Sequence, residues 1–117
     1  MNDIDIPILK KSYELYMLFH EHRKLVPKAD RFTVYERSEN LIVDLIEYFL
    51  EAGYTKSGNK CVILERASVK LNTLRFFIRL MKEARSLDNK KYTALQGLID
   101  EIGRMLGGWI RSSSTPR

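Results

Sequence analysis

The chain is poor in cysteine and proline and contains no long apolar run. Of its 117 residues, one is cysteine and three are proline. A single cysteine, Cys61, excludes an internal disulfide framework and fits a reducing cytoplasm. No apolar run approaches the roughly 20 residues that a membrane-spanning helix needs, and a start containing Asp3 and Asp5 is unlike a signal peptide. We therefore expect one cytoplasmic domain that buries its core without metal or disulfide.

Residues that build catalytic and metal sites are also scarce. The two histidines, His20 and His22, lie two apart on a predicted helix, so they point in different directions and cannot share a metal ion. We expect His20, on the apolar side of its helix, to be a core residue whose polar atoms are satisfied. Cys61 is expected to be a small core residue at the start of the third helix. Residues 14–18 contain no arginine, which excludes the Arg-to-His spacing of some four-helix-bundle ribonucleases. With no phosphate-binding loop or carboxylate pair either, we interpret the chain as non-enzymatic, without cofactor or metal.

Apolar residues recur at spacings of three and four along four segments, which is the period of amphipathic helices. The segments are residues 5–24, 30–53, 60–87 and 89–112. Nothing predicts a strand pair, and the connections are short. The expected fold is an all-α, up-down-up-down antiparallel four-helix bundle over residues 1–112, followed by a disordered tail at residues 113–117.

Each predicted helix has an expected core face and expected end signals. The core positions are Leu9, Tyr13, Tyr16 and His20 in the first helix, with Ile8, Leu15 and Phe19 flanking them; Leu41, Leu45, Phe49 and Ala52 in the second; Leu64, Ala67, Leu71, Leu74, Ile78 and Met81 in the third; and Tyr92, Leu95, Ile99, Ile102, Leu106 and Trp109 in the fourth. Thr33 and Glu36 have capping-box spacing, and we expect Gly53 to end the second helix as a left-handed cap. Asp88 or Asn89 is the expected cap of the fourth.

The predicted helix at residues 60–87 is the longest, about 40 Å at 1.5 Å per residue. Beside its core face lie further apolar residues: Val62, Val69, Phe76, Phe77 and Leu80. Such a wide apolar surface indicates contact with more than one neighbour. The rest of its surface is basic, with Arg75, Arg79, Lys82 and Arg85 following Arg66 and Lys70. This helix is expected both to pack and to meet an anion.

Charge is divided unevenly along the chain, whose net charge is +5. Up to Glu51 there are seven Lys or Arg against ten Asp or Glu, a balance of −3; from Ala52 onward there are thirteen against five, a balance of +8. The second half is therefore the expected partner of nucleic acid or another polyanion, although a solvated basic surface is the simpler alternative.

Three glycines lie inside the last predicted helix. Gly103, Gly107 and Gly108 each cost about 1 kcal/mol relative to alanine in a helix interior, so some contact must offset them. Gly103 and Gly107, four apart, form a flat strip that another backbone can approach. Close packing within the monomer is one explanation, and a contact between subunits is the one we favour.

Four segments of the chain resemble a known family. They are Ile6-Pro7-Ile8, the residues from Pro27 to Thr33, those from Glu65 to Leu71, and those from Asp100 to Trp109. In order and loop length they are similar to the bacterial four-helix-bundle proteins that include the accessory variability determinant of diversity-generating retroelements. Proteins encoded in intervening sequences of large-subunit rRNA genes belong to the same broad family.

The resemblance implies a small basic bundle that assembles as a homopentamer, binds RNA or DNA and associates with a reverse transcriptase. That enzyme makes mutagenic cDNA from a template RNA. Basic positions carried over by the resemblance are Arg31, Arg37, Arg66, Lys70, Arg75, Arg79 and Arg104, and the charge pattern of the basic second half adds Lys82 and Arg111. The alternative is an rRNA intervening-sequence type of protein, acting as a protein-interaction scaffold without a retroelement. We also expect a cyclic homo-oligomer, a pentamer by resemblance, with Gly103 and Gly107 at the interface.

Overall fold

The computed structural model describes residues 6–114, apart from the side chain of Ser57, and it is helical almost throughout. Four long helices account for most of it: α1 (Ile6–Glu21), α3 (Glu36–Gly53), α4 (Ser57–Glu83) and α5 (Asn89–Ser114). Three short elements join α1 to α3: the 3₁₀ turn η1 (Arg23–Leu25), α2 (Lys28–Asp30) and the π-helical turn η2 (Arg31–Tyr35). No strand occurs among the described residues. The predicted all-α fold is confirmed.

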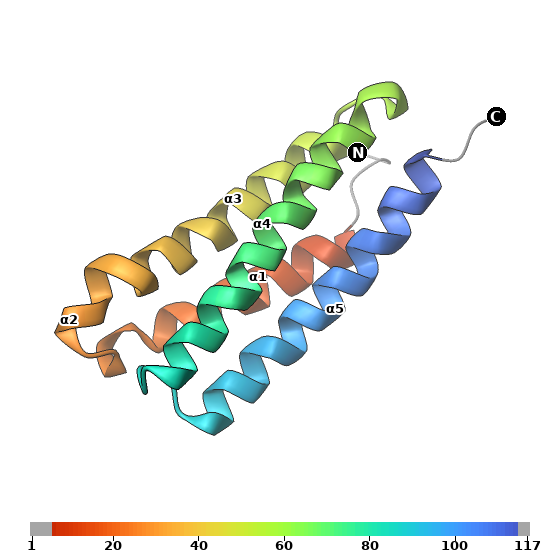
Figure 1. Cartoon of the computed structure of the whole chain (residues 1–117). Coiled ribbons are helices and arrows are strands. Elements are labelled where there is room, and N and C mark those ends of the chain that lie inside the picture. The colour runs from red at the N-terminus through yellow and green to blue at the C-terminus, as the bar shows by residue number, and fades with distance from the viewer. Residues whose placement is uncertain (1–5, 115–117) are drawn as a thin grey trace.

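The long helices form an elongated bundle of about 50 × 19 × 19 Å (Figure 1). Around the bundle axis the order is α1, α3, α4, α5, and each helix packs against the next. The end of α5 lies at the same end of the bundle as the α3–α4 connection, and the shorter α1 begins part of the way along; the α4–α5 turn and α2 lie at the opposite end (Figure 1). This is the predicted up-down-up-down bundle. None of its described helices is long and apolar enough to cross a bilayer.

The core faces of the later helices were predicted correctly. The predicted residues of α3 and α4 are all buried, and so are Leu95, Ile99, Ile102 and Leu106 of α5. Tyr92 and Trp109 pack against that core and are partly buried. The wide apolar surface of α4 divides in two, because Val62, Val69, Phe76 and Leu80 are exposed while Phe77 packs partly inside.

The predicted face of α1 was wrong. Its buried residues are Ile8, Ser12, Leu15 and Phe19, so the helix is turned by about one residue from the expected face, and Tyr13 is exposed. The burial of Ser12 is possible because its hydroxyl donates to the carbonyl of Ile8 at 2.8 Å, which satisfies the polar group within the helix.

The prediction that His20 lies in the core was wrong, because His22 occupies the core instead. His20 is exposed, and its Nδ1 lies 3.0 Å from Glu39. His22 is the core histidine, only 4% exposed. Its Nε2 lies 3.2 Å from the backbone carbonyl of Ser86, which can only accept, so Nε2 carries the proton. Its Nδ1 has no partner among the described residues.

Helical structure resumes directly after Pro27, which contradicts the capping box expected at Thr33 and Glu36. Thr33 lies inside η2, and its hydroxyl is 3.5 Å from the carbonyl of Asp30. The π turn places Tyr35 in the core, where its ring stacks on Phe19 at 4.4 Å between centroids. Its hydroxyl donates to the Phe19 carbonyl at 2.7 Å. Burial raises the pKa of the Tyr35 phenol well above its usual value, so the group remains a donor.

The predicted left-handed cap at Gly53 was wrong, and the left-handed residue lies in another turn. Gly53 is buried inside α3 and is not a left-handed cap, since no described glycine has positive φ. The left-handed residue is Arg85, with φ of 67°. There the Ser86 amide donates to the carbonyl of Met81 at 2.8 Å, and the Arg85 amide donates to that of Lys82 at 3.0 Å, a Schellman ending.

The predicted cap of α5 is confirmed at Asp88, whose carboxylate accepts a hydrogen bond from the Lys91 amide at 2.8 Å. At the other end, α5 continues to Ser114, so Ser113 and Ser114 are helical rather than part of a disordered tail. Residues 115–117, on which the rest of that prediction falls, lie outside the described residues.

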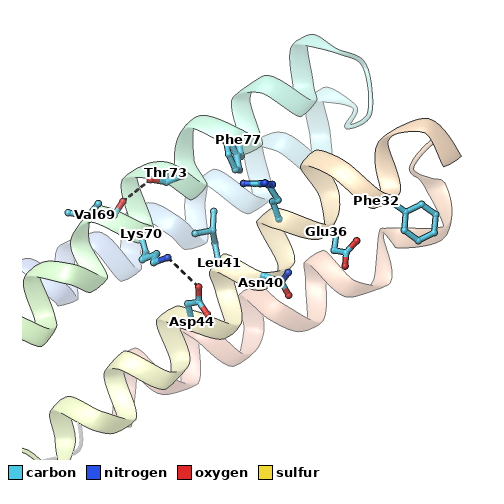
Figure 2. Close-up of a pocket in the computed structure, with 10 residues that line it drawn as sticks. Phe32, Glu36, Asn40, Leu41, Asp44, Val69, Lys70, Thr73 and Phe77 are labelled. Atoms are coloured by element: carbon cyan, nitrogen blue, oxygen red, sulfur yellow. Dashed lines mark hydrogen bonds and ion pairs between the residues drawn. The ribbon is translucent and has the colours of Figure 1, made fainter.

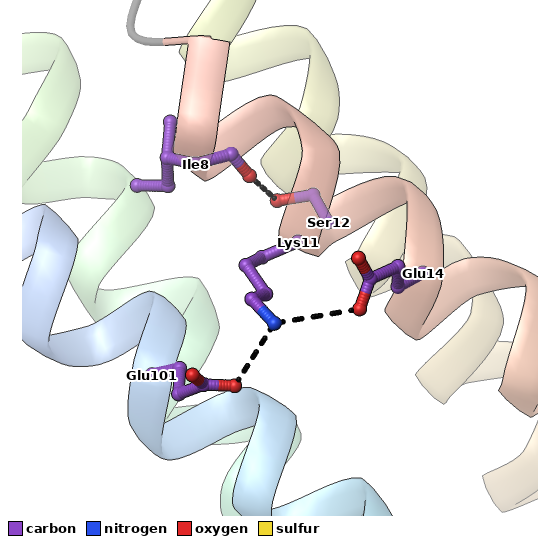
Figure 3. A network of polar contacts seen from close by, with 5 residues as sticks. All are labelled: Ile8, Lys11, Ser12, Glu14 and Glu101. Atoms are coloured by element: carbon purple, nitrogen blue, oxygen red, sulfur yellow. Dashed lines mark hydrogen bonds and ion pairs between the residues drawn. The ribbon is translucent and has the colours of Figure 1, made fainter.

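A polar bridge joins the first helix to the last. Lys11 lies 3.5 Å from Glu14 of its own helix and 3.3 Å from Glu101 of α5 (Figure 3). The hydrogen bond and charge of Glu101, more than those of Glu14, raise the pKa of the Lys11 ammonium. The bridge is partly exposed to solvent, so it fixes the register of the two helices more than it stabilises the fold.

Candidate nucleic-acid interface

The structure sorts the nine predicted cations into three places. Arg75, Arg79, Lys82, Arg104 and Arg111 lie on α4 and α5; Arg37, Arg66 and Lys70 lie on α3 and α4; and Arg31 lies at the start of η2. Two members of the first group, Arg75 and Arg79, line a groove between α4 and α5 with a volume of about 490 Å³. The groove is lined by Asn72, Arg75, Phe76, Arg79, Tyr92, Gln96 and Asp100.

Arg75 is the least available cation of this group. Its guanidinium forms a close ion pair with Asp100 across the two helices. The amide of Gln96 also donates to the Arg75 backbone carbonyl at 3.3 Å. These contacts hold α4 against α5, so the main role of Arg75 is to align the two sides of the groove.

Arg79 and Lys82 project more freely from the same side of α4. Arg79 lies 3.6 Å from Glu83 one turn along, with both side chains about two-thirds exposed. Such a pair contributes little and yields readily to a phosphate. The ammonium of Lys82 lies 4.7 Å from the centre of the Tyr92 ring, a cation–π contact that orients it and leaves its charge unneutralised.

Arg104 and Arg111 continue the basic surface along α5, and both are exposed. The glycine strip lies beside them. A Cβ at Gly103 would come within 3.1 Å of the Arg75 guanidinium and 3.5 Å of Leu71, so close packing inside the chain accounts for this glycine. A Cβ at Gly107 would meet only Arg111, at an ordinary 3.6 Å. No described residue of the same chain therefore requires glycine at position 107.

A second groove, of about 610 Å³, lies between α3 and α4 (Figure 2). It contains Arg37 and Lys70, but Lys70 lies 3.5 Å from Asp44, and Glu36 adds another carboxylate. Phe32, Val69 and Phe77 supply apolar surface to its lining. This mixture of both charges with exposed apolar groups is less suited to a polyanion than the α4–α5 side.

Arg31 has a structural role in this arrangement. Its Nε donates to the carbonyl of Val26 at 2.9 Å and its Nη2 to that of Lys24 at 3.1 Å. These bonds close the connection from α1 to α2. Arg66 is exposed on α4 between Val62 and Val69.

Sequence reasoning missed Phe76, which was assigned to packing. The residue is 64% exposed and lies in the α4–α5 groove beside Arg79. The available signal was its position between Leu74 and Ile78, the core residues two places before and after it. A residue midway between two core positions of a helix points away from the core.

The fold and this surface define a class of protein: a small helical bundle with one strongly basic side. Within residues 6–114, no group of three or more His, Cys, Asp or Glu side chains is placed to hold a metal ion. The model of the bAvd-like family matches residues 7–113. The chain therefore belongs to this family of accessory variability determinants, as its motifs indicated. No match was found among curated proteins.

Proposed function

We propose that this chain is a nucleic-acid-binding accessory protein of a diversity-generating retroelement, acting in the cytoplasm. In this role it associates with the reverse transcriptase and the template RNA and supports mutagenic cDNA synthesis. The observation that carries the proposal is the α4–α5 side, where Arg79 is exposed at the groove and Lys82 and Arg104 are exposed on the same two helices. Membership of the bAvd-like family, an accessory-protein family, supports the same reading.

The main contacts in this proposal are between cations and phosphates. Seven of the nine predicted cations lie on α4 and α5, and a polyanion crossing the α4–α5 side neutralises several of them at once. Arg66 extends the surface along α4, whereas Arg37 and Lys70 occupy the mixed groove. Phosphate contacts release counterions, so the affinity for RNA or DNA must fall as salt rises, by about 0.7–0.9 in log K per log salt for each phosphate.

Binding to a labelled RNA and to a DNA of equal length, measured from low to physiological salt, tests this directly. We expect measurable binding at low salt and a linear decrease of log K with log salt. Absence of binding at low salt, or binding that does not respond to salt, would exclude a phosphate-directed role for the basic side.

Assembly of several copies is a second part of the proposal. Val62 and Val69 are 52% and 65% exposed on the first half of α4, and Gly107 offers bare backbone on α5. A closed ring needs two different surfaces on each copy. Exposed Tyr13, Val43 and Leu50, on α1 and α3, supply the second. We propose a cyclic homo-oligomer, a pentamer by family resemblance, that repeats the basic side around an axis and gains affinity from multivalency.

Gly107→Leu tests the assembly, because the nearest atom to a new Cβ is the flexible end of Arg111. We expect a lower mass by light scattering, unchanged helical content by circular dichroism, and weaker nucleic-acid binding. Gly97→Leu is the matched control, since Gly97 is exposed on the same helix with nothing within 4 Å of a Cβ. A monomeric wild-type chain at micromolar concentration, or an assembled Gly107→Leu variant, would refute the ring.

The α3–α4 groove favours a second candidate, a protein-interaction scaffold of the rRNA intervening-sequence type. Its apolar lining and paired charges, Lys70 with Asp44 among them, suit a protein segment better than a nucleic acid. The test is capture of a reverse transcriptase by the chain. If the capture persists after nuclease treatment and is lost in the Phe32→Ala variant, this groove binds that partner. A reverse transcriptase gene with template and variable repeats beside the coding sequence would distinguish the retroelement from the scaffold.

A further inference from the structure

Phe76 is a large aromatic ring placed where simple solvation would favour a polar residue. It is 64% exposed on α4, while its neighbour Phe77 packs partly into the core. The ring lies in the α4–α5 groove with Arg75 and Arg79, one residue before and three residues after it. An exposed aromatic face among cations differs from the core packing of the other α4 residues, so it requires another explanation.

The remaining lining of this groove is polar and neutral or balanced. Asn72 lies one turn before Phe76 on α4, and Gln96 comes from α5. The Gln96 amide nitrogen is used on the Arg75 carbonyl, which leaves its side-chain oxygen to accept a bond from elsewhere. Asp100 is paired with Arg75, so its carboxylate does not present an isolated negative charge. A ring, two amides and a nearby exposed cation are the groups that recognise a nucleobase with its phosphate.

We propose that the α4–α5 groove holds an unpaired nucleotide of a single-stranded nucleic acid, with its base stacked on Phe76 and its phosphate on Arg79. This inference rests on the proposed nucleic-acid binding and sharpens it. Bases within a duplex already stack on one another and do not present a free face, whereas every unpaired base does. Asn72 and Gln96 are placed to bond a base edge, but stacking itself tolerates any base.

Phe76 tests the proposal through three ligands of equal length: a single strand, the same strand with abasic sites, and a duplex. We expect Phe76→Ala to weaken binding of the single strand about tenfold, within the range measured for one stacked base. Binding of the abasic strand and the duplex should stay within twofold, and the salt dependence should be unchanged, because no cation is removed. Phe76→Leu should behave like Phe76→Ala, since it is apolar but cannot stack.

Tyr54→Ala is the matched control. Tyr54 is 67% exposed at the end of α3 and lines neither groove, so its removal changes exposed aromatic area without touching the site. We expect wild-type binding of the single strand from this variant. An equal loss with Tyr54→Ala would assign the effect to general surface hydrophobicity and overturn the proposal.

Other results also refute stacking. Equal losses for all three ligands, or no loss for any, would exclude a base on Phe76. A lower mass by light scattering for Phe76→Ala would instead assign the ring to a contact between copies. If the wild-type chain binds no nucleic acid at all, the proposed function itself fails. If it binds but prefers none of the three ligands, only the base-stacking inference fails.

Discussion

The two halves of the bundle use their charged residues differently. Residues 6–53 contain seven Lys or Arg and eight Asp or Glu, whereas residues 57–114 contain eleven and five. In the first half, Arg31 holds the backbone of the α1–α2 connection, and Arg23 lies 5.9 Å from the Phe32 ring and 5.8 Å from the Tyr35 ring. In the second half, Arg66, Lys82 and Arg104 point into solvent. Pairing, as well as number, therefore distinguishes the cations that hold the fold from those that stay available for the proposed binding.

The largest effect that separates the halves is expected at Tyr35, on the folding side. Tyr35→Ala removes a fully buried ring, its stack on Phe19 and its hydrogen bond to the Phe19 carbonyl. Large-to-small changes of this kind cost about 3–5 kcal/mol, so the denaturant midpoint should fall steeply. Tyr35→Phe keeps the stack and should cost only about 1 kcal/mol.

The division between the two halves would be refuted if Tyr35→Ala lowered nucleic-acid affinity while the fold remained intact, as judged by circular dichroism under the binding conditions. Such a result would connect the first half to binding directly. Unchanged affinity, with reduced stability, would confirm that this half supports the structure alone.

Neutralising exposed cations of α4 and α5 is expected to lower the affinity for nucleic acid while leaving the stability of the fold nearly unchanged. Arg79→Gln, Lys82→Gln and Arg104→Gln together remove three exposed cations without emptying any core position. Because each phosphate contact contributes about 0.7–0.9, the slope of log K against log salt should become shallower by about 2–3. Affinity at low salt should fall with it, and the unfolding midpoint should change little.

A triple variant of the first half provides the control for this measurement. Lys10→Gln, Lys24→Gln and Lys28→Gln remove the same total charge from exposed positions of α1, η1 and α2. If both triple variants lose affinity equally, net charge governs binding and the α4–α5 side has no special role.

The same division explains what the sequence did and did not reveal. The core faces of α4 and α5 were predictable because each helix is long and its apolar residues keep one period over about five turns. The face of α1 was not, since apolar residues lie on both sides of it and Ser12 occupies a core position. Its hydrogen bond to Ile8 makes that burial possible, and no pattern of hydrophobic residues reports such a bond.

The candidate site was predictable in outline only. The sequence identified the cations of α4 and α5, but it could not show that Arg75 pairs with Asp100 or that Arg31 bonds backbone carbonyls. Those partners lie 25 and 5 residues away along the chain. The histidines show the same limit, because the His22 partner is the Ser86 carbonyl, 64 residues distant. Contacts with particular partners decide which charged or polar residue stays available, and the periodicity of apolar residues does not report those contacts.

The smallest expected effect concerns the turn that holds α4 and α5 together. Arg85 has φ of 67°, a left-handed conformation that costs about 1–2 kcal/mol in residues with a Cβ. Arg85→Gly removes this strain, but glycine also loses more freedom on folding, so we expect a net gain of about 0.5–1 kcal/mol. The unfolding midpoint should rise slightly. Arg85→Ala is the control, because it removes the same charge and keeps the strain. A gain from Arg85→Ala as large as that from Arg85→Gly would show that repulsion between cations of the basic half, rather than backbone strain, limits the stability of this turn.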